Sequence, residues 1–438
     1  MKLRFRNLGV IDEAVIDITK PFIVFTGPNG TGKTYLSYVM SELPNAVGGF
    51  LLTLIHGDKD NYFRKIYDPA IFETESIVSG VLDPEILYPL FQKVVEGSGQ
   101  FILESLNIQT KNNKPFSIEL ATSLKEWTKE LYDLRLDCGF SLRLKKNAKS
   151  YNYTVVSEER YRTQHDKKNK EPFEMTLFLS SIFFGGAAHA TMFTAERTGI
   201  ALFSKELAVN RLQTNSQMSI PRYPSPISSG LAAAEDRASN RKFYSDYGDL
   251  ASEIEAMILK GNIVTNSDGE ILLKTGRKVY GMAAASSTVK ALADVVFYIR
   301  HRAFKMSRLI IDEPEIHLHP DNQLLLTRVF VKMINRGLRL TISTHSDYFI
   351  REINNLIMLH YSGAGFAENA HSLGYDVDDS LDAKLIQPYL FEWKANGRVR
   401  TRAIKVEKDG FSVKSIDKAI TRLNESADKL YYEMLINK

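Results

Sequence analysis

The chain has 438 residues, of which 44% are hydrophobic and 25% are charged, and its 56 basic and 52 acidic side chains give a net charge of +4. This composition supports a large core, excludes a mainly disordered chain and excludes a cationic surface over the whole molecule. The single cysteine, Cys138, excludes a disulfide framework and a multi-thiolate zinc site. Because we find neither a signal-peptide core nor an apolar run of about 18 residues, we expect a cytoplasmic protein without a membrane partner.

The N-terminal segment predicts two half-buried strands and one fully buried strand. Apolar residues alternate with polar ones at 3–5 and again at 14–18, as they do in strands with one buried face. Residues 22–25 are apolar throughout, which is typical of a strand covered on both faces. A glycine-rich loop and a predicted helix from about Thr34 to Leu43 follow, so the chain begins with a strand–loop–helix unit.

Further elements follow in chain order. In the first half we predict mostly helix at 83–135, a hairpin of strands at 140–144 and 151–156, an exposed loop at 160–172, a helix around 175–184, a core strand at 190–194 and an irregular connector at 213–245. In the second half we predict a helix at 247–259, a hairpin at 263–273, a helix at 286–302, buried strands at 309–311, 340–343 and 356–359, a hairpin turn at Asn396–Gly397, and a terminal amphipathic helix with Ile416, Ile420, Leu423, Ala427 and Leu430 on one face.

The most specific motif lies between the buried strand and the first helix. It fits the pattern GxxxxGK followed by Ser or Thr, with the residues Gly27, Pro28, Asn29, Gly30, Thr31, Gly32, Lys33 and Thr34. The glycines let backbone N–H groups converge on phosphate oxygens, and the helix N-terminus adds a favourable dipole. We therefore expect ATP here, with Lys33 at the β- and γ-phosphates and the Thr34 hydroxyl as a ligand of Mg²⁺.

An acidic pair follows another buried strand. The run Leu309-Ile-Ile ends in Asp312 and Glu313, which places Asp312 at the C-terminal edge of the sheet. There the Asp312 carboxylate is expected to hold the Mg²⁺ shell, and Glu313 is expected to act as general base on the attacking water. A strand that ends in a solvated acidic turn is the alternative, and the phosphate loop favours the catalytic reading.

A histidine follows the next predicted strand, in the run Thr341-Ile-Ser-Thr-His345-Ser346. A histidine here is positioned to hydrogen-bond the γ-phosphate. Taken alone, one histidine at a strand end is more often structural. Because His345 comes about 30 residues after the acidic pair, we assign it to the catalytic site.

The order GPNGTGKT, IIDEPEIHLHP and STHS resembles the ABC-type ATPase heads of the RecF, SMC and OLD-nuclease group. The resemblance covers residues 1–56 and roughly 175–360. It implies an α/β fold, a P-loop NTPase with an ABC-ATPase-like head and a mixed sheet, interrupted by a helical and hairpin insertion. The implied divisions are a first part of the head at 1–60, the insertion at 61–174, a second part of the head at 175–360, and a C-terminal hairpin and helix completing the head at 361–438.

The resemblance also implies a homodimer or higher homo-oligomer, in which each nucleotide contacts a signature loop of the partner subunit. The candidate signature residues are Ser286 and Ser287, at the start of a predicted helix. Ser287 and Thr288 stand where the family usually has two glycines, and an ordinary capped helix is the alternative. Arg197 lies in a segment that resembles the family's "PAER" run, where it either contacts nucleotide or supports the phosphate loop. No glutamine has the context of a Q-loop.

Two other patterns resemble metal sites. His317 and His319 have the spacing of metal ligands, but the family motif explains them as packing at a dimer interface. Residues 376–379 resemble the acidic pair of a TOPRIM nuclease, but no apolar strand precedes them. We predict a loop of solvated acids there and no nuclease activity.

Basic residues and tyrosines gather between 143 and 170, inside the predicted insertion. They form either a DNA- or RNA-binding surface or a solvated face diluted by nearby acids. Stand-alone proteins that resemble this chain often belong to bacterial anti-phage systems such as PARIS and Septu. That implies a sensor or scaffold for a separate effector protein, a toxin or nuclease. A DNA-repair or chromosome-maintenance ATPase that acts directly on DNA, RecF/SMC-like, is the alternative, and a transporter engine lacks any supporting signal.

Overall fold

The computed structural model describes residues 1–56, 77–107, 115–132, 136–137, 140–146, 151–157, 170–186, 188–203, 223–240, 244–362 and 367–436. Most of the loop predicted at 160–172, the first part of the connector predicted at 213–245, and the side chains of the basic patch lie outside the described residues.

A mixed nine-stranded sheet forms the centre of the molecule. Its strands are, in order across the sheet, β5 (Ser117–Leu120), β1 (Lys2–Leu8), β2 (Ile11–Asp17), β16 (Val399–Ala403), β15 (Ile386–Trp393), β3 (Phe22–Thr26), β14 (Arg339–Ser343), β13 (Arg308–Asp312) and β9 (Ala190–Phe193). Neighbouring strands from β15 to β9 are parallel, whereas β15/β16, β1/β2 and β1/β5 are antiparallel. The predicted α/β class with a mixed sheet is confirmed.

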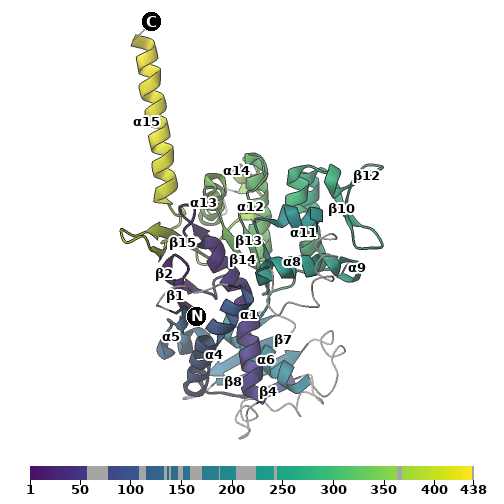
Figure 1. The fold of residues 1–438 in the computed structure, drawn as a ribbon, viewed down its shortest axis with the longest axis vertical. Coiled ribbons are helices and arrows are strands. Elements are labelled where there is room, and N and C mark those ends of the chain that lie inside the picture. The colour runs from purple at the N-terminus through teal and green to yellow at the C-terminus, as the bar shows by residue number, and fades with distance from the viewer. Residues whose placement is uncertain are drawn as a thin grey trace.

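Helices cover both faces of this sheet (Figure 1). On one face lie α1 (Lys33–His56), α4 (Pro84–Ser105) and α6 (Lys170–Phe184), and on the other lie α10 (Gly248–Ile254), α11 (Ser287–His301), α12 (Pro320–Asn335) and α13 (Asp347–Tyr361). Strand β3 separates the two cores, because Ile23 and Phe25 face the first and Phe22 and Val24 face the second. The run of four apolar residues in β3 thus has the double burial predicted for it.

Helix α1 is longer than predicted and forms the centre of the first core. Among the described helices it alone has the length and apolar composition to cross a membrane. However, 56% of its most apolar 18-residue stretch is buried inside the protein. Leu36, Val39, Leu43 and Val47 are fully buried against the sheet, α4 and α6. Such packing is typical of the core helix of a globular protein.

Smaller elements flank the sheet. A four-stranded sheet consists of β4 (Ile77–Leu82), β8 (Tyr151–Ser157), β7 (Phe140–Lys146) and β6 (Leu136–Asp137), and a three-stranded sheet consists of β10 (Asn262–Thr265), β11 (Ile271–Thr275) and β12 (Lys278–Gly281). Short helices in the described residues include α5 (Leu124–Tyr132), α14 (Ala367–Ser372), the π-helix η2 (Glu255–Leu259), and the 3₁₀-helices η3 (Met282–Ala284) and η5 (Val377–Asp379). The three predicted hairpins, including that of β15 and β16, are confirmed.

Two sequence predictions are wrong. The strand predicted at 356–359 belongs to helix α13, because Phe349, Ile353 and Leu356 bury one helical face after the N-cap at Ser346. The connector at 213–245 contains α8 (Ser225–Glu235) and α9 (Arg237–Asn240), since proline is well tolerated in the first turn of a helix. The stretch 83–135 is mostly helical, as predicted, in α4 and α5, and it also includes β5, which pairs with β1 and so joins the predicted insertion to the central sheet.

The chain ends in α15 (Lys414–Ile436), which extends away from the rest of the molecule as a single helix (Figure 1). Its amphipathic pattern was predicted, but in the described part of the chain no second element covers its apolar face.

Candidate active site

The phosphate loop joins β3 to α1 and requires glycine for steric reasons. Gly27 has φ +133°, and a Cβ atom there would collide with the carbonyl oxygen of Phe391 on the neighbouring strand β15. Gly32 has φ +88°, and its Cβ would lie 3.0 Å from Cγ1 of Ile11. The loop is thus held between β15 and β2 with a backbone that side chains rarely allow. Backbone N–H groups at a helix start form the cradle that phosphates need.

Lys33 lies at the start of α1 with its ammonium group turned back onto the loop. Its Nζ donates to the carbonyl oxygens of Gly27, at 3.1 Å, and Pro28, at 2.8 Å. Burial lowers the pKa of Lys33 to about 8, although Asp312 and Glu313 act in the opposite direction. The lysine is therefore a buried cation whose charge is only partly compensated within the chain, as expected for a group that receives phosphate oxygens.

Asp312 and Thr34 meet beside this loop. Asp312 ends β13, and its Oδ2 accepts a 2.8 Å hydrogen bond from the Thr34 hydroxyl. The Ser343 hydroxyl, at the end of the neighbouring parallel strand β14, donates to Oδ1 of Asp312. Burial raises the pKa of Asp312, and the two hydrogen bonds lower the pKa in part because they stabilise the carboxylate. A hydroxyl and a carboxylate at hydrogen-bond distance are hard oxygen donors, so this pair fits the ligand preference of Mg²⁺.

Glu313 follows in a left-handed backbone conformation, with φ +47°. Its N–H donates to the carbonyl of Ser343 at 2.9 Å, which fixes the turn. The side chain is half-buried, and no hydrogen bond to its carboxylate is found within the described residues. Burial, followed by the charge of Asp312, raises the pKa of Glu313. A half-buried carboxylate with a raised pKa beside a phosphate loop has the properties of a general base.

His345 lies at the end of β14, on the same edge of the sheet. Burial and the nearby charge of Lys33 lower the pKa of His345 to about 4, so its imidazole is neutral at pH 7. Its backbone N–H donates at 2.8 Å to Oε1 of Glu315, which also accepts a 2.8 Å bond from the Thr344 hydroxyl. Glu315 thus fixes the loop that carries His345, a role that sequence reasoning missed. The only signal was its place two residues after Glu313.

Arg197 lies behind the acidic pair and contacts backbone atoms. Its guanidinium donates to the carbonyl oxygens of Asp312 at 2.8 Å, Glu313 at 2.9 Å and Ala291 at 3.0 Å. The side chain is 2% exposed, and burial lowers its pKa to about 10. Of the two roles considered for Arg197, nucleotide contact and structural support, the geometry favours structural support. The part that Arg197 supports is the acidic turn and α11, and not the phosphate loop.

We expect Arg197→Met to lower the free energy of unfolding by roughly 3 kcal/mol, because four carbonyls, those of Asp312, Glu313, Ala291 and Thr194, lose a charged donor. Urea denaturation followed by circular dichroism measures the change. Arg398→Met is the matched control, since Arg398 also donates to carbonyls, those of Gly9 and Ile11, from a partly exposed position. Equal effects of the two substitutions would contradict the buttressing role.

Ser286 and Ser287 lie apart from these groups on the exposed surface. Ser286 caps α11 by accepting a 3.3 Å bond from the N–H of Val289. Two residues after Ser286, the hydroxyl of Thr288 donates to the carbonyl of His317 at 2.7 Å. No hydrogen bond joins either serine to residues 27–34 of the same chain within the described part. The structure therefore brings together the phosphate loop, Asp312, Glu313 and His345, and leaves the two serines facing outward.

The two patterns that resemble metal sites have local structural roles. His319 caps α12, where its Nδ1 accepts from the N–H of Asp321 at 3.4 Å. Asp379 is 2% exposed and lies 3.6 Å from Nζ of Lys332, so the acids at 376–379 are not all solvated as predicted. The difference arises because η5 packs against α12, which the sequence pattern did not indicate. In the described ranges, no group of three or more His, Cys, Asp or Glu side chains is arranged to hold a metal.

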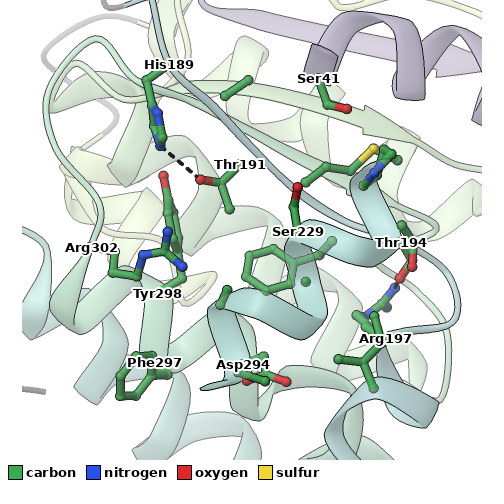
Figure 2. Close-up of a pocket in the computed structure, with 18 of the residues that line it drawn as sticks. Ser41, His189, Thr191, Thr194, Arg197, Ser229, Asp294, Phe297, Tyr298 and Arg302 are labelled. Atoms are coloured by element: carbon green, nitrogen blue, oxygen red, sulfur yellow. Dashed lines mark hydrogen bonds between the residues drawn. The ribbon is translucent and has the colours of Figure 1, made fainter. Parts of the chain in front are cut away.

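A cavity of about 250 Å³ lies next to this site, beside β9 and between α1, α8 and α11 (Figure 2). Its wall includes His189, Thr191, Arg302 and Arg197, and a 2.6 Å ion pair joins Arg237 to Asp294 at its side. None of residues 27–34 lines it. The cavity is therefore separate from the phosphate-loop motif at the start of α1.

The lowered pKa of Lys33 predicts how ATP binding depends on pH. Lys33 carries its charge below about pH 8 and loses it above, whereas bound phosphates favour the charged form. We expect the Kd for ATP to rise by up to about tenfold per pH unit above pH 8. Calorimetric titration between pH 7 and 9.5 measures this. A flat profile over that range would contradict the placement of Lys33 at the phosphates.

Comparisons with known proteins agree with the motif order. A family model described as an AAA ATPase domain matches residues 1–350. No curated protein matches the chain. Among solved structures, the chain is similar to an SMC head bound to the C-terminal winged-helix domain of ScpA (12% identity, 93% of this chain and 98% of that chain covered, TM-score 0.35). It is also similar to the SMC head domain of Thermotoga maritima (11% identity, 92% and 98% covered, TM-score 0.32) and to a Pyrococcus furiosus Smc head domain (13% identity, 97% and 98% covered, TM-score 0.33).

Proposed function

This chain belongs to the AAA ATPase domain family, and we propose that it binds ATP with Mg²⁺ at residues 27–34 and hydrolyses it to ADP and phosphate. The single observation that carries this proposal is the convergence of Lys33, Thr34, Asp312 and Glu313 at one edge of the sheet. A phosphate cradle, an oxygen-ligand pair and a free carboxylate are what hydrolysis of a nucleoside triphosphate requires.

Each residue has a distinct role in this proposal. Lys33 and the loop N–H groups bind the phosphates, and Thr34 with Asp312 holds Mg²⁺, which when bound neutralises charge on the β- and γ-phosphates. Glu313 accepts a proton from the attacking water. His345 is neutral and so offers a hydrogen bond to the γ-phosphate without adding charge. Arg197 and Glu315 position the two turns that carry Glu313 and His345.

We infer that two heads associate during this cycle. Ser286 and Ser287 are exposed and lie at the N-terminus of α11, where a helix dipole favours an anion. The Thr288–His317 bond connects this helix start to the segment after Glu313. In a dimer of heads, Ser286 and Ser287 of one subunit would contact the nucleotide on its partner, so ATP would join the subunits and hydrolysis would release them.

For the biological output, we propose control of a separate effector protein, a toxin or a nuclease, in anti-phage defence. Its support is the resemblance of the three motifs to stand-alone ATPases of such systems, which is a family-level analogy. The alternative is an ATPase that acts directly on DNA, and its support is the basic segment between 143 and 170.

ATP turnover by the purified chain, measured with and without duplex DNA, tests both the proposed ATP hydrolysis and the proposed control of an effector protein. Phosphate release that depends on Mg²⁺ supports the ATPase, and a rate insensitive to DNA supports the effector reading. Strong stimulation by DNA in the absence of any partner would contradict that reading and favour the alternative. Absence of phosphate release under either condition would contradict hydrolysis by this chain on its own.

A further inference from the structure

Helix α15 exposes far more apolar surface than a solitary helix in water tolerates. It spans 23 residues, or about 35 Å, and extends away from the body of the molecule (Figure 1). Leu423 is 71% exposed, Leu430 is 68% exposed and Met434 is 50% exposed. A helix of this length gains most of its stability from packing of an apolar face. The helix therefore requires a partner surface.

The spacing of the apolar residues indicates the geometry of that partner. They recur at alternating intervals of four and three residues, at Ile416, Ile420, Leu423, Ala427, Leu430 and Met434. An average spacing of 3.5 residues is the a/d repeat of a coiled coil, and the heptad places Ile420, Ala427 and Met434 at a and the other three at d. Tyr432 and Leu435 are also exposed but fall at f and b, outside this seam.

The repeat is symmetric about residue 425, so the helix fits a second copy of itself in reverse. In an antiparallel pair with its two-fold axis at residue 425, Leu423 faces Ala427 and Ile420 faces Leu430. Each layer then pairs an a with a d position. The small Ala427 is always opposite the large Leu423, which fills space better than the Ala427–Ala427 layer of a parallel pair.

The charges are complementary in the same orientation. Residues 414–422 contain three basic side chains and one acidic, whereas residues 425–433 contain three acidic and one basic. Antiparallel pairing places the positive half of each helix along the negative half of the other. A parallel pair would instead align halves that carry the same charge.

We propose that two copies of this chain associate through α15 as an antiparallel coiled coil. This interface is isologous and lies on a different element from residues 286–287, so it does not depend on nucleotide or on the proposed association of heads. The two bodies then lie at opposite ends of the paired helices.

The mass of the full chain in solution tests the association. Without nucleotide, light scattering after size exclusion is expected to give twice 49.6 kDa at micromolar concentration. Leu430→Asp places a charge in the seam and is expected to halve the mass. Tyr432→Asp is the matched control, because Tyr432 is 65% exposed on the same helical turn but lies outside the seam, and it is expected to keep the dimer.

Disulfide trapping tests the orientation, in a chain whose native Cys138 is replaced by serine. A mixture of the Ile420→Cys and Leu430→Cys chains is expected to form a cross-linked dimer, whereas Leu430→Cys alone is not. In the antiparallel pair the two Leu430 positions are about 15 Å apart along the axis. If two Leu430→Cys chains form a disulfide with each other, and the Ile420→Cys and Leu430→Cys chains do not, the helices pair in parallel and the proposal is overturned. A wild-type chain that stays monomeric, or equal effects of Leu430→Asp and Tyr432→Asp, would also overturn it.

Discussion

Replacing Lys33 with alanine is expected to weaken ATP binding by roughly 100-fold, because a charge-assisted bond to phosphate contributes about 1.5–3 kcal/mol. Lys33 is 6% exposed at the start of α1, and among the described residues its ammonium group donates only to the carbonyls of Gly27 and Pro28. No other lysine of the described residues approaches this loop as a hydrogen-bond donor. Equilibrium titration with a fluorescent ATP analogue measures the change.

The fold is not expected to suffer from this substitution. Burial lowers the pKa of Lys33 to about 8, which means that the protein disfavours its charge, and removing a desolvated cation relieves that cost. Lys20→Ala is the control, because Lys20 also donates its ammonium group to a backbone carbonyl, that of Lys384, but at an exposed site. If Lys33→Ala binds ATP as tightly as Lys20→Ala while both remain folded, ATP binds elsewhere.

Replacing Glu313 with glutamine is expected to slow hydrolysis by about 10²- to 10⁴-fold while ATP binding is retained. The amide keeps the size of the side chain but cannot accept the proton of the attacking water. Because the N–H of Glu313 is held by the Ser343 carbonyl and its C=O by Arg197, the turn should keep its conformation. Stopped-flow detection of phosphate measures the rate, and the bound ATP is expected to hold two heads together.

Glu196→Gln provides a control at the same site. Glu196 is an exposed carboxylate whose charge also raises the pKa of Asp312 and of Glu313, so its neutralisation changes the local field without removing the general base. We expect it to alter the rate far less than Glu313→Gln. A Glu313→Gln chain that hydrolyses ATP at the wild-type rate would show that the base has been assigned to the wrong residue.

Most of the candidate site could be predicted from the sequence because its residues lie at, or directly after, the ends of strands. The glycines of the phosphate loop, the acid that ends β13 and the histidine after β14 each follow an apolar run, and parallel neighbouring strands bring such ends to one edge. The same apolar runs predicted the core strands β3, β13 and β14. The alternating segments predicted β1 and β2.

The sequence did not predict contacts that depend on packing between distant segments. The role of Arg197 comes from carbonyls near residues 291 and 312, and that of Glu315 comes from the backbone of His345. Nothing in the local pattern of either residue specifies these partners. The sequence predicts a strand inside helix α13, because a run of four apolar residues fits either structure unless the facing core is known.

The central claim is that ATP bound at Lys33 is hydrolysed with the help of Glu313. The most direct measurement is chromatographic identification of the nucleotide that remains on the purified protein after incubation with ATP and Mg²⁺. We expect ADP and free phosphate from the wild-type chain, intact ATP on Glu313→Gln, and no nucleotide on Lys33→Ala. Intact ATP on the wild-type chain, or ADP on Glu313→Gln in the wild-type amount, would contradict it.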